Sequence, residues 1–142
     1  MQPVEISPGL VVQGFTPPLK LRDFKLIAFD MDSTLINMER VDDIADAAGR
    51  KAEVAAITEA AMRGELDFEA ALRARVALLR DLPVTALDQC YAERVRLNPG
   101  AETLTRTMAA LGADTALVSG GFTFFSEKVA AAAGFARTRA NR

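Results

Sequence analysis

Two aspartates one residue apart follow a short apolar run in this chain of 142 residues. Asp30 and Asp32 come directly after Leu26–Phe29, which has the composition of a buried strand. Parallel strands of α/β proteins present ligand groups at their carboxyl ends. Two carboxylates crowded at such an end repel each other unless a cation lies between them, which indicates an oxygen-preferring metal such as Mg²⁺. The pair therefore predicts a phosphoryl-transfer site. A solvated Asx turn gives the same pattern, whereas a calcium loop needs more acids and a glycine.

A second polar segment, Ser119-Gly120-Gly121, follows the apolar run Thr115–Val118. Glycines let the backbone approach a ligand closely, and the start of a following helix offers N–H groups and a favourable dipole to an anion. Ser119 adds a hydroxyl donor. Most such tripeptides are ordinary turns, and we expect a turn between strand and helix here. If the two apolar runs are neighbouring parallel strands, the acidic end and the anion-binding end lie side by side.

The remaining pattern predicts an α/β fold, with a Rossmann-type parallel sheet that is interrupted by a helical insertion. Residues 1–24 contain one strand-like piece at 10–12 and form a lead-in. Residues 39–96 contain four amphipathic helical stretches and no strand, which indicates an inserted four-helix cap. Residues 25–38 and 97–142 then form the α/β core. Asn98-Pro99 is expected to cap and begin one of its helices, and glycines at 112 and 134 are expected to end helices.

One arginine falls on the apolar side of a predicted helix over 67–80. At about 100° per residue, Phe68, Leu72 and Leu79 share one stripe, and Arg75 lies in its middle. A guanidinium on an apolar face must be paired, because burying it alone costs free energy. A structural explanation for Arg75 is that its side chain snorkels to solvent or forms an ion pair with a nearby acid. A functional explanation is that it binds a substrate carboxylate through two hydrogen bonds, and both interpretations stay open at this stage.

Composition excludes several classes of function. The chain has no histidine, so His-based triads and His-ligated zinc are ruled out. Its net charge of −2 argues against binding to nucleic acid, and no basic patch indicates a membrane surface. No apolar run is long enough to span a bilayer, and the N-terminus lacks a secretory pattern. With Cys90 as its single cysteine, the chain allows no internal disulfide, and we expect a cytoplasmic protein.

Together these residues resemble the phosphoserine phosphatases of the haloacid dehalogenase superfamily. Residues 29–35, Phe-Asp-Met-Asp-Ser-Thr-Leu, are similar to the first superfamily motif, and residues 118–122, Val-Ser-Gly-Gly-Phe, to the second. Residues 57–62 and 72–76 are similar to parts of the helical cap. The resemblance runs from about residue 25 to the end of the chain.

The resemblance implies a role for each matching residue. Asp30 would be the nucleophile that forms an aspartyl-phosphate, and Asp32 the general acid and then the base. Mg²⁺ would be held by the Asp30 carboxylate and the Asp32 carbonyl. The substrate would be O-phospho-L-serine, hydrolysed to L-serine and phosphate in serine biosynthesis. Its other implied contacts are Ser119 and the Gly120 N–H for phosphate, Glu39 for the ammonium, Arg75 for the carboxylate, and Met62 and Phe68 for the wall of the pocket.

The resemblance also implies motifs that this sequence does not contain. A lysine and a Gly-Asp-Gly-x-Asn-Asp segment, which completes the Mg²⁺ site, are expected after Gly134 and are not found. We therefore expect the first two-thirds of an enzyme, with activity reduced by orders of magnitude. An inactive or weakly ligand-binding fragment is the alternative, and a related phosphatase or phosphotransferase with another small substrate is a third. Strand 25–30 would have an unpaired edge, which predicts self-association or domain swapping.

Overall fold

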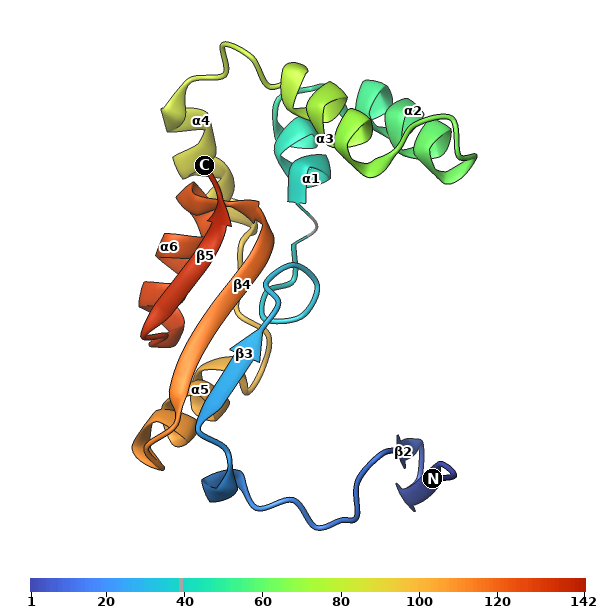
Figure 1. The fold of residues 1–142 in the computed structure, drawn as a ribbon. Helices are drawn as coiled ribbons and strands as arrows, with labels where there is room; N and C mark the ends of the chain where they lie inside the picture. Colours follow the sequence, from blue (N-terminus) through green and yellow to red (C-terminus); the bar gives the residue numbers. More distant parts are fainter. Residues whose placement is uncertain (39) are drawn as a thin grey trace.

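A small parallel sheet forms the centre of the molecule. The computed structural model describes residues 1–38 and 40–142, and within them the sheet has the order β3-β4-β5 (Figure 1). Its strands are β3 (Leu26–Phe29), β4 (Asp114–Phe122) and β5 (Arg137–Asn141), and both pairings are parallel. This arrangement confirms the predicted α/β fold class.

Two helices cover one face of this sheet. They are α5 (Ala101–Ala110), which leads into β4, and α6 (Thr123–Ala133), which connects β4 to β5. Both helices contact β4 and each other, and α6 also contacts β5 (Figure 1). The chain leaves α6 at Gly134, whose φ of 80° requires the left-handed conformation that glycine adopts without strain.

Four helices lie between β3 and α5 in the chain, as the sequence predicted. They are α1 (Arg40–Ala47), α2 (Lys51–Met62), α3 (Phe68–Ala77) and α4 (Val84–Arg94). Asp67 begins α3 by accepting a hydrogen bond from the Ala70 N–H at 2.7 Å, as an N-cap aspartate does. The division into a cap at 39–96 and a core at 25–38 and 97–142 stays a prediction. None of the helices in the described residues is both long and apolar enough to pass through a lipid bilayer.

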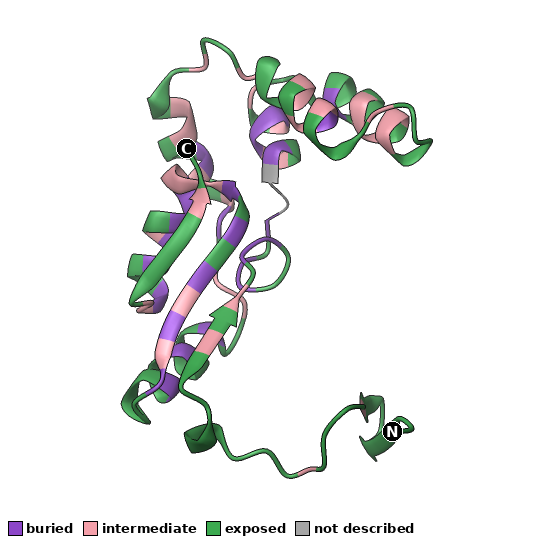
Figure 2. Ribbon diagram, in the orientation of Figure 1, coloured by how far each residue is buried: buried purple, intermediate pink, exposed green. Residues whose placement is uncertain are grey.

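The second face of the sheet is open. In β4, residues alternate between buried and more exposed positions, and Leu117 is fully buried whereas Val118 is 52% exposed (Figure 2). Leu26 of β3 is 55% exposed, and it shares the Val118 face because it pairs with Asp114 in register. Within the described residues β3 pairs only with β4. The expected open edge is thus present, together with an uncovered face that carries Leu26 and Val118, and self-association along the edge stays a prediction.

Three local expectations were wrong or incomplete. Helix α5 begins at Ala101 with Gly100 as its N-cap, not at Asn98-Pro99, because the Asn98 side chain bonds to another loop. Strand β5 was not predicted, since Arg-Thr-Arg-Ala-Asn shows no apolar alternation. The strand at 10–12 is confirmed as β2 (Leu10–Val12), but it pairs with an unpredicted β1 (Val4–Ser7) in an antiparallel hairpin. A 3₁₀ turn, η1 (Leu21–Asp23), leads from this hairpin region toward β3.

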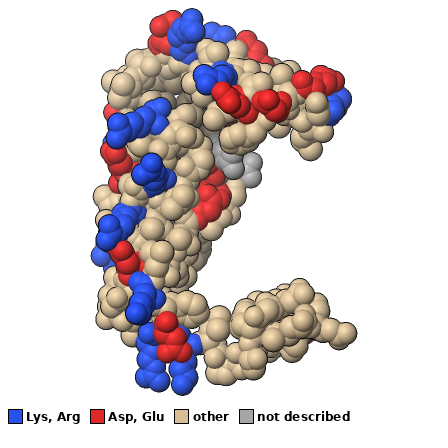
Figure 3. Space-filling model, viewed as in Figure 1, with Lys and Arg blue, Asp and Glu red and all other residues tan. Residues whose placement is uncertain are grey.

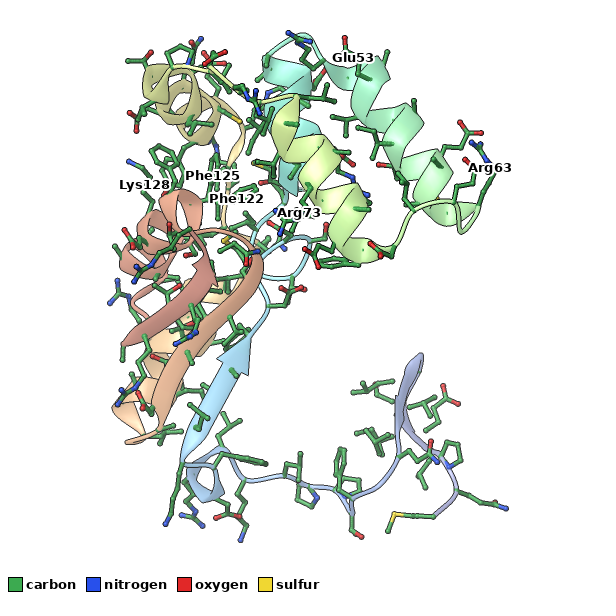
Figure 4. All side chains as sticks on the ribbon, turned by 45° about the horizontal axis from the view of Figure 1, so that its top comes forward. Glu53, Arg63, Arg73, Phe122, Phe125 and Lys128 are labelled. Atoms are coloured by element: carbon green, nitrogen blue, oxygen red, sulfur yellow. The ribbon has the colours of Figure 1, made fainter. Side chains whose placement is uncertain are left out.

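Charged contacts tie the inserted helices to one another and to the sheet layer. Arg94 of α4 donates a hydrogen bond to Asp46 of α1 at 2.8 Å. Lys128 of α6 pairs with Asp88 of α4 at 3.1 Å, and its Nζ lies 4.9 Å from the centre of the Phe124 ring. Figure 4 shows the Lys128 side chain on the α4 side of α6, close to Phe125. The position of α4 is therefore set by both layers.

We predict that Asp46→Asn lowers the melting temperature at neutral pH and that this loss disappears in acid. The hydrogen bond from Arg94, and then the charge of Lys51, hold the pKa of Asp46 below its ordinary value of 3.8. A carboxyl whose pKa is lower in the folded state stabilises the fold above its unfolded pKa and loses that contribution as pH falls through the folded pKa. Thermal unfolding of both chains from pH 7 down to pH 2 tests this. The prediction would be wrong if the difference in melting temperature between the two chains stayed the same when the pH falls below the ordinary pKa of 3.8.

Candidate active site

The loop after β3 is tightly closed around one carbonyl group. The Met31 carbonyl oxygen accepts hydrogen bonds from the N–H groups of Thr34, Leu35 and Ile36, at 3.3, 2.9 and 3.1 Å. Met31, Leu35 and Ile36 are all buried, at 2%, 1% and 1% exposure. Ser33 has a φ of 53°, an uncommon conformation for a residue with a side chain. Buried apolar side chains thus hold a strained turn that contains Asp32 and directly follows Asp30.

Asparagine side chains fasten this loop to the segment before α5. Asn98 Nδ2 donates to the Thr34 carbonyl at 2.8 Å, and the Asn98 N–H donates to the Leu35 carbonyl at 2.9 Å. Asn37 Oδ1 accepts the Arg96 N–H at 2.8 Å. The loop therefore has a fixed position relative to the chain that enters the second half of the sheet layer.

The two aspartates differ in exposure. Asp30 lies directly beyond the end of β3 and is exposed, whereas Asp32 is only 8% exposed. Because β3 and β4 are parallel neighbours with Phe29 paired to Leu117, both aspartates lie at the edge of the sheet where β4 also reaches its carboxyl half. Of the two carboxylates, Asp30 is thus the one that solvent reaches freely.

Ser119, Gly120 and Gly121 lie within β4, so the prediction of a turn was wrong. The strand continues to Phe122, and α6 begins at the next residue. The segment nevertheless departs from regular pairing, because the register between β4 and β5 shifts between Val118 and Phe122. The Gly121 N–H donates to Ser119 Oγ at 2.9 Å. This local bond replaces a strand-ladder bond and keeps the serine side chain against the backbone.

Gly121 is the point at which the two motifs meet. A Cβ atom added there would lie 3.1 Å from Ser119 Oγ, 3.2 Å from Met31 Cε and 3.5 Å from Asp32 Oδ2. A side chain at this position would therefore crowd its neighbours, and these contacts place the Ser119 hydroxyl and the Asp32 carboxylate on the same side of β4. The juxtaposition expected for two neighbouring parallel strands is confirmed for Asp32 and Ser119.

The inserted helices border two clefts. One, of about 520 Å³, lies between α1 and α2 and includes Met62 and, from the loop after β3, Asn37. The other, of about 830 Å³, lies between α3 and the carboxyl ends of β4 and β5, where Arg73 and Phe122 both line it (Figure 4). Both volumes are in the range of small-molecule sites. In the space-filling view, acidic atoms face the hollow between these helices and the sheet layer (Figure 3).

The other predicted substrate residues are not brought together with Asp32 and Ser119 by any contact in the described residues. Met62 and Phe68 are 84% and 70% exposed, so Phe68 does not belong to a buried stripe of α3 as the helical pattern suggested. Arg75 is half-buried, and its Nε atom is buried with no hydrogen-bond partner in the part of the chain that the structure describes. This nitrogen therefore takes part in no ion pair within the described residues. Glu39 lies outside the described residues.

The acidic loop offers oxygen donors to a metal ion without forming a complete site. Within residues 1–38 and 40–142, no group of three or more His, Cys, Asp or Glu side chains is placed to hold a metal. The exposed Asp30 carboxylate and the adjacent loop carbonyls suit a hard cation such as Mg²⁺, which tolerates several water ligands. The donor set of this loop therefore fits a hard, oxygen-preferring cation that keeps several water ligands.

The comparisons with known proteins agree with this geometry. The family of haloacid dehalogenase-like hydrolases matches residues 24–140, and the chain belongs to that family. It is 63% identical, over 99% of its length, to a phosphoserine phosphatase of a Polaromonas species, and 59% identical to the phosphoserine phosphatase of Albidiferax ferrireducens. The chain spans 60% of the length of each of these two relatives.

Solved structures show the same similarity. A haloacid dehalogenase family hydrolase from Salmonella enterica serovar Typhi superposes with a TM-score of 0.77 at 36% identity, covering 81% of this chain and 39% of that one. A substrate-bound phosphoserine phosphatase superposes with a TM-score of 0.73 at 41% identity, covering 84% of this chain and 56% of that one. The observed fold is therefore the fold of this family.

Sequence reasoning missed the residues that hold the site in place. Asn37 and Asn98 were not singled out for positioning the site, because a single asparagine in a polar stretch has no distinctive spacing. A partial signal existed for Gly121, since two consecutive glycines at the end of an apolar run indicate a close approach of other groups.

We predict that Gly121→Ala lowers the free energy of unfolding by about 1–3 kcal/mol, the usual cost of overpacking, and weakens binding of inorganic phosphate. The new methyl group must displace Ser119 Oγ and Met31 Cε. Urea unfolding and calorimetric phosphate titration measure the two effects. Val118→Ala on the open face of the same strand is the matched control and should keep its phosphate affinity. Equal affinity of Gly121→Ala and the unmodified chain would show that the site tolerates the methyl group.

Proposed function

We propose that this chain carries the nucleophile and phosphate-binding part of a Mg²⁺-dependent phosphatase that hydrolyses O-phospho-L-serine. The observation that carries the proposal is the meeting of Asp32 and Ser119 beside Gly121, at the carboxyl edge of two parallel strands. The 63% identity to a phosphoserine phosphatase supports the substrate class. The meeting of Asp32 and Ser119 does not involve Glu39, which lies outside the described residues.

The proposed reaction has two displacement steps. An oxygen of the Asp30 carboxylate forms a bond to phosphorus while the bond from phosphorus to the serine oxygen breaks, and Asp32 gives a proton to that oxygen. Asp32 then takes a proton from water, whose oxygen attacks the phosphoryl group and releases phosphate from Asp30. The exposure of Asp30 suits direct attack, and the shielded position of Asp32 suits proton transfer.

Negative charge accumulates at this edge during both steps. A bound Mg²⁺, held by the Asp30 carboxylate and the Asp32 carbonyl, would neutralise charge on the transferring group. The Ser119 hydroxyl and the Gly120 N–H would donate hydrogen bonds to phosphate oxygens. These donors cost little reorganisation, because Ser119 is already held by the Gly121 N–H.

Arg75 is the residue that we propose for binding the substrate carboxylate. Its half-buried guanidinium, with an Nε that lacks a partner in the described residues, has unused donors that an incoming carboxylate satisfies. Arg73, on the same helix, is exposed and pairs with Glu69 at 2.8 Å. The two arginines of α3 are thus chemically alike and differ in whether their donors are already used.

We predict that the chain releases phosphate from O-phospho-L-serine in the presence of Mg²⁺ and that Asp30→Asn lowers the rate about a thousandfold or more, as loss of a nucleophile does. Phosphate release by the purified chain measures this. Asp81→Asn, in an exposed turn after α3, is the matched control and should keep the rate. Equal release by the Asp30→Asn chain and the unmodified chain would contradict the role of Asp30. No release by any of the three chains would favour a ligand-binding fragment.

We also predict that Arg75→Ala raises KM for O-phospho-L-serine about 10- to 100-fold, the usual effect of losing hydrogen bonds to a charged group. KM for an aryl phosphate without a carboxylate should change little, because that substrate has no group for Arg75. Parallel steady-state assays with both substrates test this, with Arg73→Ala as the matched control. Equal losses on the two substrates would rule out a carboxylate clamp.

A further inference from the structure

The carboxyl half of β4 contains a bulge at the residues proposed for phosphate binding. Val118 pairs with Arg139 and Phe122 pairs with Asn141, so the segment 119–121 faces a single residue of β5. Bulges of this kind interrupt the ladder and reorient side chains, and they are frequent beside active sites. The backbone of the bulge therefore needs partners from outside the regular ladder.

The side chain of Asn141 supplies one of these partners. Its Nδ2 donates to the Gly120 carbonyl oxygen at 2.9 Å, and the Gly121 N–H donates to Ser119 Oγ at 2.9 Å. The Gly120 carbonyl and the Gly121 N–H belong to one peptide group, which is planar and rigid. The peptide group is thus held at both ends, and rotation of the group would break both hydrogen bonds.

We propose that Asn141 is a positioning residue of the phosphate site and that it acts through this peptide group on the Ser119 hydroxyl. The inference rests on the proposed function, since it names a further residue of the same site. Because Ser119 Oγ already accepts the Gly121 N–H, its own hydrogen is available to an anion. Asn141 keeps that arrangement in the absence of substrate, so the donor does not need to reorient on binding.

The first test compares the affinity of inorganic phosphate, measured by calorimetry with Mg²⁺ present, in the unmodified chain and in Asn141→Leu. Leucine branches at the same carbon as asparagine but is larger, lacks the donor and leaves the net charge unchanged. We expect binding about three- to tenfold weaker, the range for a lost hydrogen bond. Thr138→Ala, at an exposed position of the same strand, is the matched control and should bind as the unmodified chain does. Unchanged affinity in Asn141→Leu would overturn the inference.

A double-mutant cycle with Ser119→Ala separates positioning from general destabilisation. If Asn141 acts through Ser119, the chain with both substitutions binds phosphate as weakly as Ser119→Ala alone. If the fold-losses in phosphate affinity of the two single substitutions instead multiply in the double variant, Asn141 acts independently of Ser119 and the inference is overturned. If Asn141→Leu does not fold, Asn141→Ala takes its place in the cycle.

The amide resonance of Gly121 gives a measurement that needs no ligand. We expect it to shift in Asn141→Leu and to stay unchanged in Thr138→Ala, and an unchanged resonance in both would overturn the inference. If only this inference is wrong, the unmodified chain still binds phosphate and still releases phosphate from O-phospho-L-serine. If the unmodified chain binds no phosphate, the inference fails as well, and the phosphate-release assay reports separately on the proposed function.

Discussion

The parallel pairing of β3 with β4 is the constraint on which the candidate site depends. The pairing aligns Leu26 with Asp114 and Phe29 with Leu117, so the first motif and the second reach the same edge of the sheet. A slip of one residue would turn every side chain of β3 to the opposite face. The register is defined by the burial of Leu117 against the helical layer, while Leu26 remains on the open face. Packing of one face thus sets the distance between the groups that we propose to act on a phosphate.

Around this edge, asparagine side chains form hydrogen bonds with backbone groups that have no partner in a regular strand ladder. Asn37 and Asn98 hold the loop after β3, and Asn141 holds the bulge of β4. A neutral amide satisfies a backbone group without adding charge, which leaves the charge of this edge to the aspartates and to the phosphate of the proposed function. The same side-chain type therefore recurs at three points of the frame.

The four inserted helices have a different character from the sheet layer. Buried apolar side chains and a few charged contacts, such as Lys128 with Asp88, connect these helices to the sheet layer. On the outer surfaces of the helices, ion pairs such as Arg73 with Glu69 are exposed to solvent and contribute little to stability. Met62 and Phe68 are exposed on these helices, and Arg75 has an unused donor. Apolar side chains as exposed as Met62 and Phe68 are a feature of surfaces that bind a ligand or a partner.

The sequence by itself determined the α/β class, the four helices between β3 and α5, and the choice of Asp30, Asp32 and Ser119 as candidate site residues, because apolar periodicity and motif spacing are local properties. It did not determine that β4 continues through its two glycines, that Asn98 bonds to the loop after β3 instead of capping α5, or that residues 137–141 form a strand. These features depend on hydrogen bonds between residues far apart in the chain. A polar strand and a bulge are stable only when a neighbour supplies the missing partners, so only the tertiary structure decided them.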